Sequence, residues 1–233
     1  MSPIVIIPPS IQLPVTLDLI GTPAISGGAA NVLTTAAAPI TPSGQANSML
    51  CALVVCSHVN TSGYTVYPQL SCTSTVGGAL TRLTSASINA NNSNVGSVHF
   101  FYRVAPTASA QNLTATYQMS GGAWGDRIRI IPFVLYNVDQ ASPFGTVVVA
   151  AGSGSTSLTV GSSAASSLLM YGSGTQSPPT AFNQTLLQQY FSVTDNGYSD
   201  YLLLGSAVGG SSTTFTSTNS NRWGAWGIEV RAA

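Results

Sequence analysis

The sequence predicts an all-β protein, an antiparallel β-sandwich of jelly-roll type with an extended N-terminal arm. Three observations support this prediction. Apolar and polar residues alternate with a period of two through much of the chain, and a helical period is rare. Glycine-rich turns separate the short strands, as in sandwiches and jelly rolls. Hydrophobic residues make up 44% of the 233-residue chain, which is enough to fill a sizeable core.

The first 42 residues differ from the rest. Prolines at positions 3, 8, 9 and 14 alternate with isolated apolar residues, a pattern typical of extended chain. We therefore expect an arm over residues 1–42 and a sandwich over residues 43–233. The arm could pack on its own domain or on a neighbouring subunit, as donated strands do. The apolar residues expected to make that contact are Ile4, Ile6, Ile7, Ile11, Leu13, Val15 and Leu17.

Within the sandwich, three continuous apolar runs predict strands covered on both faces, at residues 49–56, 128–136 and 168–171. Alternating stretches at 98–104 and 111–119 predict half-buried antiparallel strands. Further strands are expected at 64–70, 79–84, 146–150, 157–160, 186–193, 198–206, 213–216 and 225–231. Residues 184–191 would also fit a short helix, but their aromatic residues favour a strand.

Charge is scarce. Only 5% of the residues are charged, and all six basic residues are arginines, spread along the chain. Because no basic cluster could displace counterions from phosphates, we expect no nucleic-acid partner. The apolar runs fall short of the ~20 residues that span a bilayer, and the N-terminus lacks a basic leader, so we expect neither membrane insertion nor a signal peptide. A surface with little electrostatic repulsion suits a protein packed against other proteins.

The three cysteines, Cys51, Cys56 and Cys72, form no C-x-x-C pair and cannot all be joined in disulfides. Cys51 and Cys56 are five residues apart on one predicted strand, so they should face opposite sides of it. We expect three buried free thiols, acting as small apolar side chains in a protein that folds in a reducing compartment.

Catalytic motifs are weak in this sequence. The only histidines are His58 and His99, and no G-x-S-x-G elbow accompanies them, so we expect no enzyme and no cofactor. Asp195, Asn196 and Asp200 could offer oxygen ligands to a metal, but their spacing is not that of a known calcium loop. A hairpin turn is the favoured interpretation. Asp139 is expected to bond local backbone.

Three tryptophans bear on binding. Trp124 lies in a glycine-rich loop, and Trp223 follows Arg222. Trp124, Trp223 and Arg222 are therefore candidates for contact with a ligand or an interface. The alternative, which we favour, is that each tryptophan caps one end of the sandwich. Trp226 is expected in the core.

From Gly77 onward the chain carries an ordered series of motifs: GALTR at 78–82, VHFFY at 98–102, VAPT at 104–107, TATY at 114–117, YNVDQASP at 136–143 and WGAWGIEVR at 223–231. This series resembles a β-sandwich domain with a G-V-D-Q-x-x-P type motif and a terminal tryptophan strand. That domain recurs in tailed-phage virion proteins and bacterial exported proteins. The resemblance covers residues 43–233 and departs from the pattern at Asn137, where glycine is usual, and at 107–109.

The resemblance implies a domain without a shared catalytic site. Together with the composition, it predicts a structural virion protein of a tailed bacteriophage, a minor tail or tail-tip/fibre component made in the host bacterial cytoplasm. The alternatives are a capsid decoration or head-fibre protein and a carbohydrate-binding surface-adhesion module. The expected partners are other virion proteins, further copies of the chain in a homo-oligomer (a trimer favoured), and a possible host-surface glycan.

Overall fold

The structure is a computed structural model. It describes residues 12–28, 32–57, 69–90, 93–118, 126–162, 164–175, 177–195, 198–218 and 221–233. Within these ranges the regular secondary structure is β-strand, without helix, in several antiparallel sheets. The prediction of an all-β protein is therefore confirmed, and the arrangement is consistent with a β-sandwich. Residues 185–191 belong to a strand, as favoured, and Gln184 precedes it. In the described part of the chain no helix could cross a membrane.

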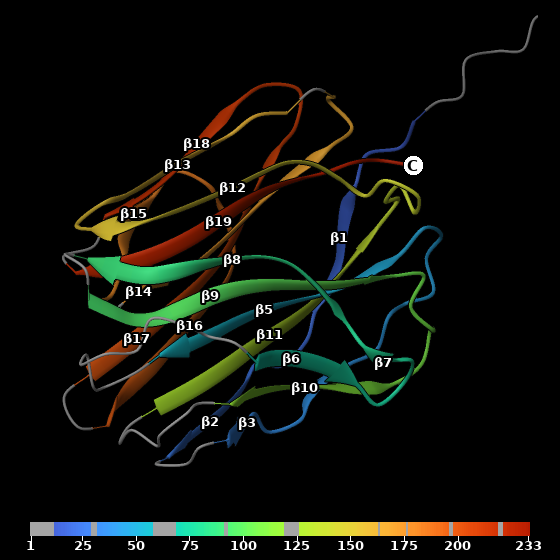
Figure 1. The fold of residues 1–233 in the computed structure, drawn as a ribbon. Coiled ribbons are helices and arrows are strands. Elements are labelled where there is room, and N and C mark those ends of the chain that lie inside the picture. The colour runs from blue at the N-terminus through green and yellow to red at the C-terminus, as the bar shows by residue number, and fades with distance from the viewer. Residues whose placement is uncertain are drawn as a thin grey trace, which may run out of the picture.

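The first eleven strands, within residues 16–136, build two stacked sheets, which we call the N-terminal module (Figure 1). Its inner sheet contains β1 (Thr16–Ile20), β2 (Ala24–Gly28), β5 (Met49–Ser57), β8 (Thr81–Ala90), β9 (Ser93–Val104) and β11 (Asp126–Tyr136). Its outer sheet contains β3 (Val32–Thr34), β4 (Ala38–Ile40), β6 (Gln69–Ser74), β7 (Gly78–Ala79) and β10 (Gln111–Gln118).

The last eight strands, within residues 144–230, build a second pair of sheets, the C-terminal module. Its inner sheet contains β12 (Phe144–Ser153), β14 (Leu168–Thr175), β16 (Thr185–Asp195), β17 (Tyr198–Val208) and β19 (Arg222–Val230). Its outer sheet contains β13 (Thr156–Val160), β15 (Thr180–Phe182) and β18 (Thr213–Thr218). The two inner sheets are the halves of one 11-stranded sheet, which continues from β8 to β19 through the pairing of Asn89 with Trp223.

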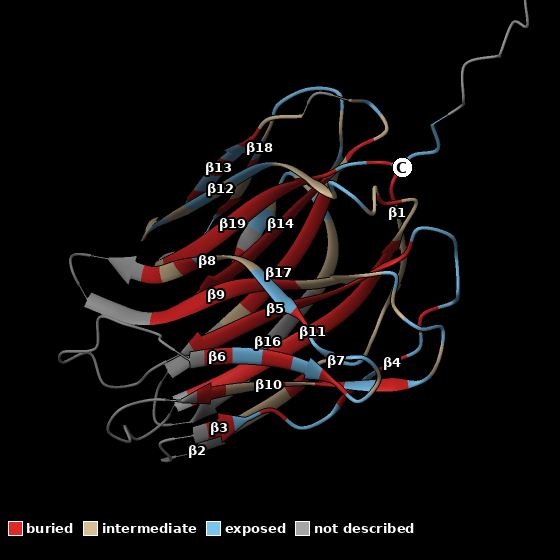
Figure 2. Cartoon of the chain, turned by 45° about the vertical axis from the view of Figure 1, so that its right-hand side comes forward, coloured by how far each residue is buried: buried red, intermediate tan, exposed pale blue. Residues whose placement is uncertain are grey.

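The inner sheets pack face to face on a central core, so the molecule has four layers where most domains have two or three. The sequence of β5 is continuously apolar because each of its two faces packs on a core. Cys51 and Leu53 face the central core, whereas Ala52 and Cys56 face the outer sheet of the N-terminal module. β11 and β14 are likewise buried on both sides, and Figure 2 shows these inner strands buried along much of their length. The predictions for 49–56, 128–136 and 168–171 are confirmed, as is the opposite orientation of Cys51 and Cys56.

The outer sheets bury one face only. In β10, Leu113, Ala115 and Tyr117 face inward, while Thr114 and Thr116 face outward. This is the alternation expected of a strand with one solvated face. It confirms the half-buried strand predicted there.

The structure corrects the prediction for the N-terminal segment. From Thr16 to Ile40 the chain is not an arm outside the sandwich, because β1 and β2 pair with β11 while β3 and β4 pair with β10. Its prolines are compatible with strands since they lie between strands or, as Pro39, in an edge strand. Val15 and Leu17 pack on the central core, whereas Leu13 is exposed. Ile4, Ile6, Ile7 and Ile11 lie outside the described residues.

The three cysteines are expected to resist an aqueous thiol reagent while the protein is folded. All three are buried free thiols. Burial raises the pKa of Cys51 and raises the pKa of Cys72 to about 12, so reactive thiolate is scarce at neutral pH. A chromogenic disulfide reagent should therefore react with all three cysteines in denaturant and with none in native buffer. Rapid reaction in native buffer would contradict the burial of these strands.

Candidate functional site

Trp223 does not lie on the surface, where a binding role would require it. It is 6% exposed and belongs to the core between the two sheets of the C-terminal module. The backbone of Gly152 packs on the indole, since a Cβ there would lie 3.1 Å from its Cζ2 atom. Trp223 is therefore a core residue of the C-terminal module and is not available to stack on a sugar. Trp226 is fully buried, as expected, and Arg222 is half-buried at the start of β19.

The acidic hairpin is described only through its backbone. Asp195 pairs with Tyr198 and Asp200 pairs with Ser192, so β16 and β17 form the expected hairpin. The side chains of Asp195 and Asp200, and all of Asn196, lie outside the described residues, as does Trp124. In the part of the chain that the structure describes, no group of three or more His, Cys, Asp or Glu residues could hold a metal ion.

His99 is sealed inside the N-terminal module. It is 1% exposed, and its Nε2 lies 2.6 Å from Ser97 Oγ in a hydrogen bond. Burial, with a smaller contribution from Arg82, lowers the pKa of His99 to about 3. The imidazole is therefore neutral and out of reach of a ligand. His58 lies outside the described residues.

Asp139 has the local role that the sequence predicted. Its Oδ1 accepts backbone hydrogen bonds from Ala141 and Ser142, which lower the pKa of the carboxyl group. The turn from β11 to β12 is thereby fixed next to a small open pocket.

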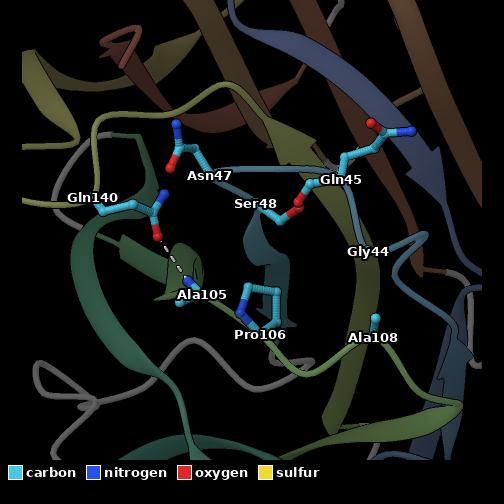
Figure 3. Close-up of a pocket in the computed structure, with 8 residues that line it drawn as sticks. All are labelled: Gly44, Gln45, Asn47, Ser48, Ala105, Pro106, Ala108 and Gln140. Carbon is cyan, nitrogen blue, oxygen red and sulfur yellow. Dashed lines mark hydrogen bonds between the residues drawn. The ribbon is translucent and has the colours of Figure 1, made fainter.

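Three chain segments meet at this pocket, which has a volume of about 290 Å³ (Figure 3). They precede β5, follow β9 and follow β11. The pocket is lined by Gly44, Gln45, Asn47, Ser48, Ala105, Pro106, Ala108 and Gln140. The backbone N–H of Ala105 donates to Gln140 Oε1 at 2.9 Å and to Ser48 O at 3.0 Å. The lining is therefore uncharged, with amide groups as its polar component.

The backbone around the pocket is strained. Among the described residues, four that are not glycine have a positive φ, and three of them, Asn47, Ala105 and Asn137, lie in the segments that meet here. The N–H groups of Asn137 and Val138 bond the carbonyls of Ala46 and Asn47, which holds these segments together. Alanine is unfavourable in this conformation, whereas asparagine tolerates it. The sequence marked Asn137 as a position where glycine is usual, which agrees with its positive φ, but it could not locate the pocket.

Ala105→Gly is expected to stabilise the protein by about 1 kcal/mol, because glycine adopts a φ of 46° without a steric penalty. Asn47→Gly, at a φ of 52°, is the matched control and should change the stability by less than about 0.5 kcal/mol. Chemical unfolding of the two variants and the parent chain would measure both effects. Equal shifts for the two variants would mean that Ala105 is not strained.

The outer sheets present neutral surfaces. No charged residue occurs in the strands of the N-terminal outer sheet, β3, β4, β6, β7 and β10. The same holds for the strands of the C-terminal outer sheet, β13, β15 and β18. Cross-strand threonine pairs join neighbouring strands, with Oγ1 atoms 3.1 Å apart for Thr73 and Thr114 and 2.8 Å apart for Thr159 and Thr214. The strands of both outer sheets therefore present hydroxyl and amide groups. Arg103 of β9 brings a charged side chain to the end of the N-terminal outer sheet, where it donates to Val76 O, Gly78 O and Gln111 Oε1.

An apolar edge lies between these neutral surfaces. β12 pairs only with β19 among the described strands, and its Val147 and Val149 are 38% and 51% exposed. The start of β12 is bulged at 145–146, where Thr146 N–H donates to the buried carboxylate of Glu229. The remainder of β12 is a regular strand edge bearing exposed valines, which sequence reasoning did not single out.

Comparison of this chain with protein-family models, with curated protein sequences and with solved structures found no match.

Proposed function

We propose that this protein is a structural virion protein of a tailed bacteriophage, a minor tail or tail-tip component that acts by packing against copies of itself and other virion proteins. The proposal keeps the jelly-roll-type sandwich and the N-terminal arm as its finer expectations, with the arm limited to residues 1–11. A virion role is supported by the motif series from Gly77 onward, which resembles a sandwich domain of tailed-phage virion proteins. The virion would acquire the protein from the bacterial cytoplasm.

The observation that carries this proposal is the absence of charged residues from the described strands of both outer sheets. A protein free in solution normally relies on charge to keep copies apart. Broad neutral faces instead favour close and lasting contact with other proteins.

Homo-oligomerisation is part of the proposal. Neutral outer faces and the exposed valines of β12 supply surfaces on which copies can meet without repulsion. A closed ring of copies, such as a trimer, would bury these surfaces symmetrically. Light scattering on the purified full chain measures the copy number directly.

The decisive experiment is to find the protein on particles. Virions purified from the producing bacterial culture should contain this chain by mass spectrometry, and gold-labelled antibodies should mark the tail. A copy number far below that of the major capsid protein is expected for a tail component. Labelling over the capsid at high copy number would instead show a decoration protein, and absence from purified virions would reject the structural role.

The pocket beside Gln140 favours a second candidate function, binding of a neutral host-surface glycan. Amide groups on a rigid, uncharged lining suit the hydroxyls of a sugar. A glycan array probed with the full chain and with Asn47→Ala would test this function. Binding that is unaffected by Asn47→Ala would exclude the pocket as the site.

A further inference from the structure

β12 has the least protected long edge in the described part of the molecule. From Val147 to Ser153 every residue pairs regularly with β19, and no described strand pairs on the other side. Edge strands are usually blunted by lysine, proline, bulges or charge, yet β12 contains no charged residue and no proline. The edges of β1 and β16 are interrupted by register shifts, whereas the register shift of β12 lies at its start and leaves Val147 to Ser153 regular. β12 can therefore accept another strand.

Both faces of β12 are apolar. Val147 and Val149 lie opposite Ile228 and Trp226 of β19, on the side of the central core, and remain partly exposed. On the other face, Val148 and Ala150 pack against the core of the C-terminal module. A strand added at this edge would extend two cores at once. It should therefore be apolar on both of its own faces.

We propose that residues 3–8 of a neighbouring copy add to the edge of β12 as an extra strand. Their sequence is Pro-Ile-Val-Ile-Ile-Pro, so β-branched residues would stand on both faces of the added strand. The prolines would limit the strand to four residues and are tolerated at an edge. Backbone hydrogen bonds would supply affinity and the isoleucines specificity. This inference rests on the homo-oligomer in the proposed function.

The start of the described chain is anchored beside β14 and the C-terminus, on the opposite side of β19 from its own β12. Gln12 is anchored by Nε2 to Ala232 O at 2.9 Å and by Oε1 to Ser166 Oγ at 3.1 Å. Ser166 precedes β14, so the segment begins across β19 from its own β12. From Gln12 to Pro14 the chain is exposed, and in Figure 1 it leads away from the body beside the C-terminus. Residues 9–11 link the proposed strand to Gln12 and bridge at most about 14 Å, so the edge that the strand joins must lie close to this end of the molecule.

Neither surface would repel the other. Residues 1–11 contain no charged side chain, and the edge of β12 has none. The contact is therefore insensitive to ionic strength, unlike an association guided by ion pairs.

Disulfide trapping between two full-length variants tests this contact. Ile6→Cys is mixed with Val149→Cys and treated with oxidised glutathione, and the native cysteines do not compete because they are buried. The matched control is Ile6→Cys mixed with Val208→Cys, since Val208 is another exposed valine and, at 75%, more exposed than Val149. A mixed disulfide dimer at least tenfold more abundant with Val149→Cys than with Val208→Cys supports the proposal. Equal yields, or no dimer with Val149→Cys, would overturn it.

Two further measurements test whether the pairing occurs within one copy and whether it is needed for the oligomer. In the double variant Ile6→Cys/Val149→Cys, a disulfide confined to one chain at every protein concentration would show pairing within the copy and overturn the neighbour contact. Light scattering should show that Val149→Lys reduces the oligomer to monomer while Val208→Lys does not; an unchanged oligomer in Val149→Lys overturns the proposal. A parent chain that is monomeric at all concentrations refutes the homo-oligomer itself, whatever mass spectrometry of virions reveals.

Discussion

Gly172→Ala is expected to destabilise the protein by about 3 kcal/mol, which corresponds to a fall of roughly 6–12 °C in the unfolding temperature. Gly172 in β14 lies directly opposite Trp226 in β19, and a Cβ at this position would overlap the indole ring. The Trp226 indole cannot move aside to make room for this Cβ. It is fully buried, and its centroid lies 5.0 Å from that of Phe100, across the central core.

Gly161→Ala is the matched control. A Cβ there would meet Thr146 Oγ1 at 3.6 Å, an ordinary contact, so the stability should change by less than about 0.5 kcal/mol. Urea unfolding of both variants measures the difference. The penalty of Gly172→Ala should shrink when Trp226→Phe removes part of the indole, as a double-mutant cycle would reveal. Equal stability of the two alanine variants would show that the indole is not packed on β14.

The second large effect concerns acid. His99 has a pKa of about 3 in the folded protein, against 6.5 when unperturbed, because its site excludes water. Below pH 6.5 the His99 imidazole is therefore protonated in the unfolded chain but stays neutral in the folded protein. The stabilisation from this residue is fully present above pH 6.5 and is lost as the pH falls toward 3. The loss should reach about 3 kcal/mol by pH 4.5.

His99→Gln removes the titrating group and isolates its contribution. Urea unfolding at pH 7.5, 6.5, 5.5 and 4.5 should give a steep decline for the parent chain and a flatter one for the variant, whatever the stability of the variant at pH 7.5. Acidic residues contribute to both profiles equally, so the difference between them reports His99. Parallel profiles would mean that the imidazole becomes protonated inside the folded protein.

The positions of the strands could be predicted because the local pattern of apolar residues indicates which faces of each strand are buried. A run such as 49–56, apolar at every position, requires cover on both faces, and the two flanking cores provide it. The N-terminal segment misled the prediction because its prolines resemble those of a linker. A proline such as Pro39 can nevertheless lie in a strand when that strand is at an edge, because an edge strand uses only half of its backbone groups for pairing.

The candidate sites were less predictable, because they depend on contacts between distant segments. The strained φ of Ala105 is imposed by its bonds to Ser48 and Gln140, which no local pattern reveals. Trp223 follows an arginine and looks exposed in sequence, yet it closes the core of the C-terminal module. β12 is apolar on both faces, as a strand paired on both edges can be, so only the topology reveals its exposed edge.

The division into two modules, each contiguous in sequence, bears on how the protein is made. All strands of the N-terminal module precede residue 144, and ribosomes add about 5–20 residues per second, so the C-terminal module follows after roughly 4–17 seconds of further synthesis. During that interval the nascent chain carries one finished apolar face with nothing to cover it. Newly made chains should therefore depend on chaperones most strongly at this stage, and slower translation of residues 144–230 should increase aggregation.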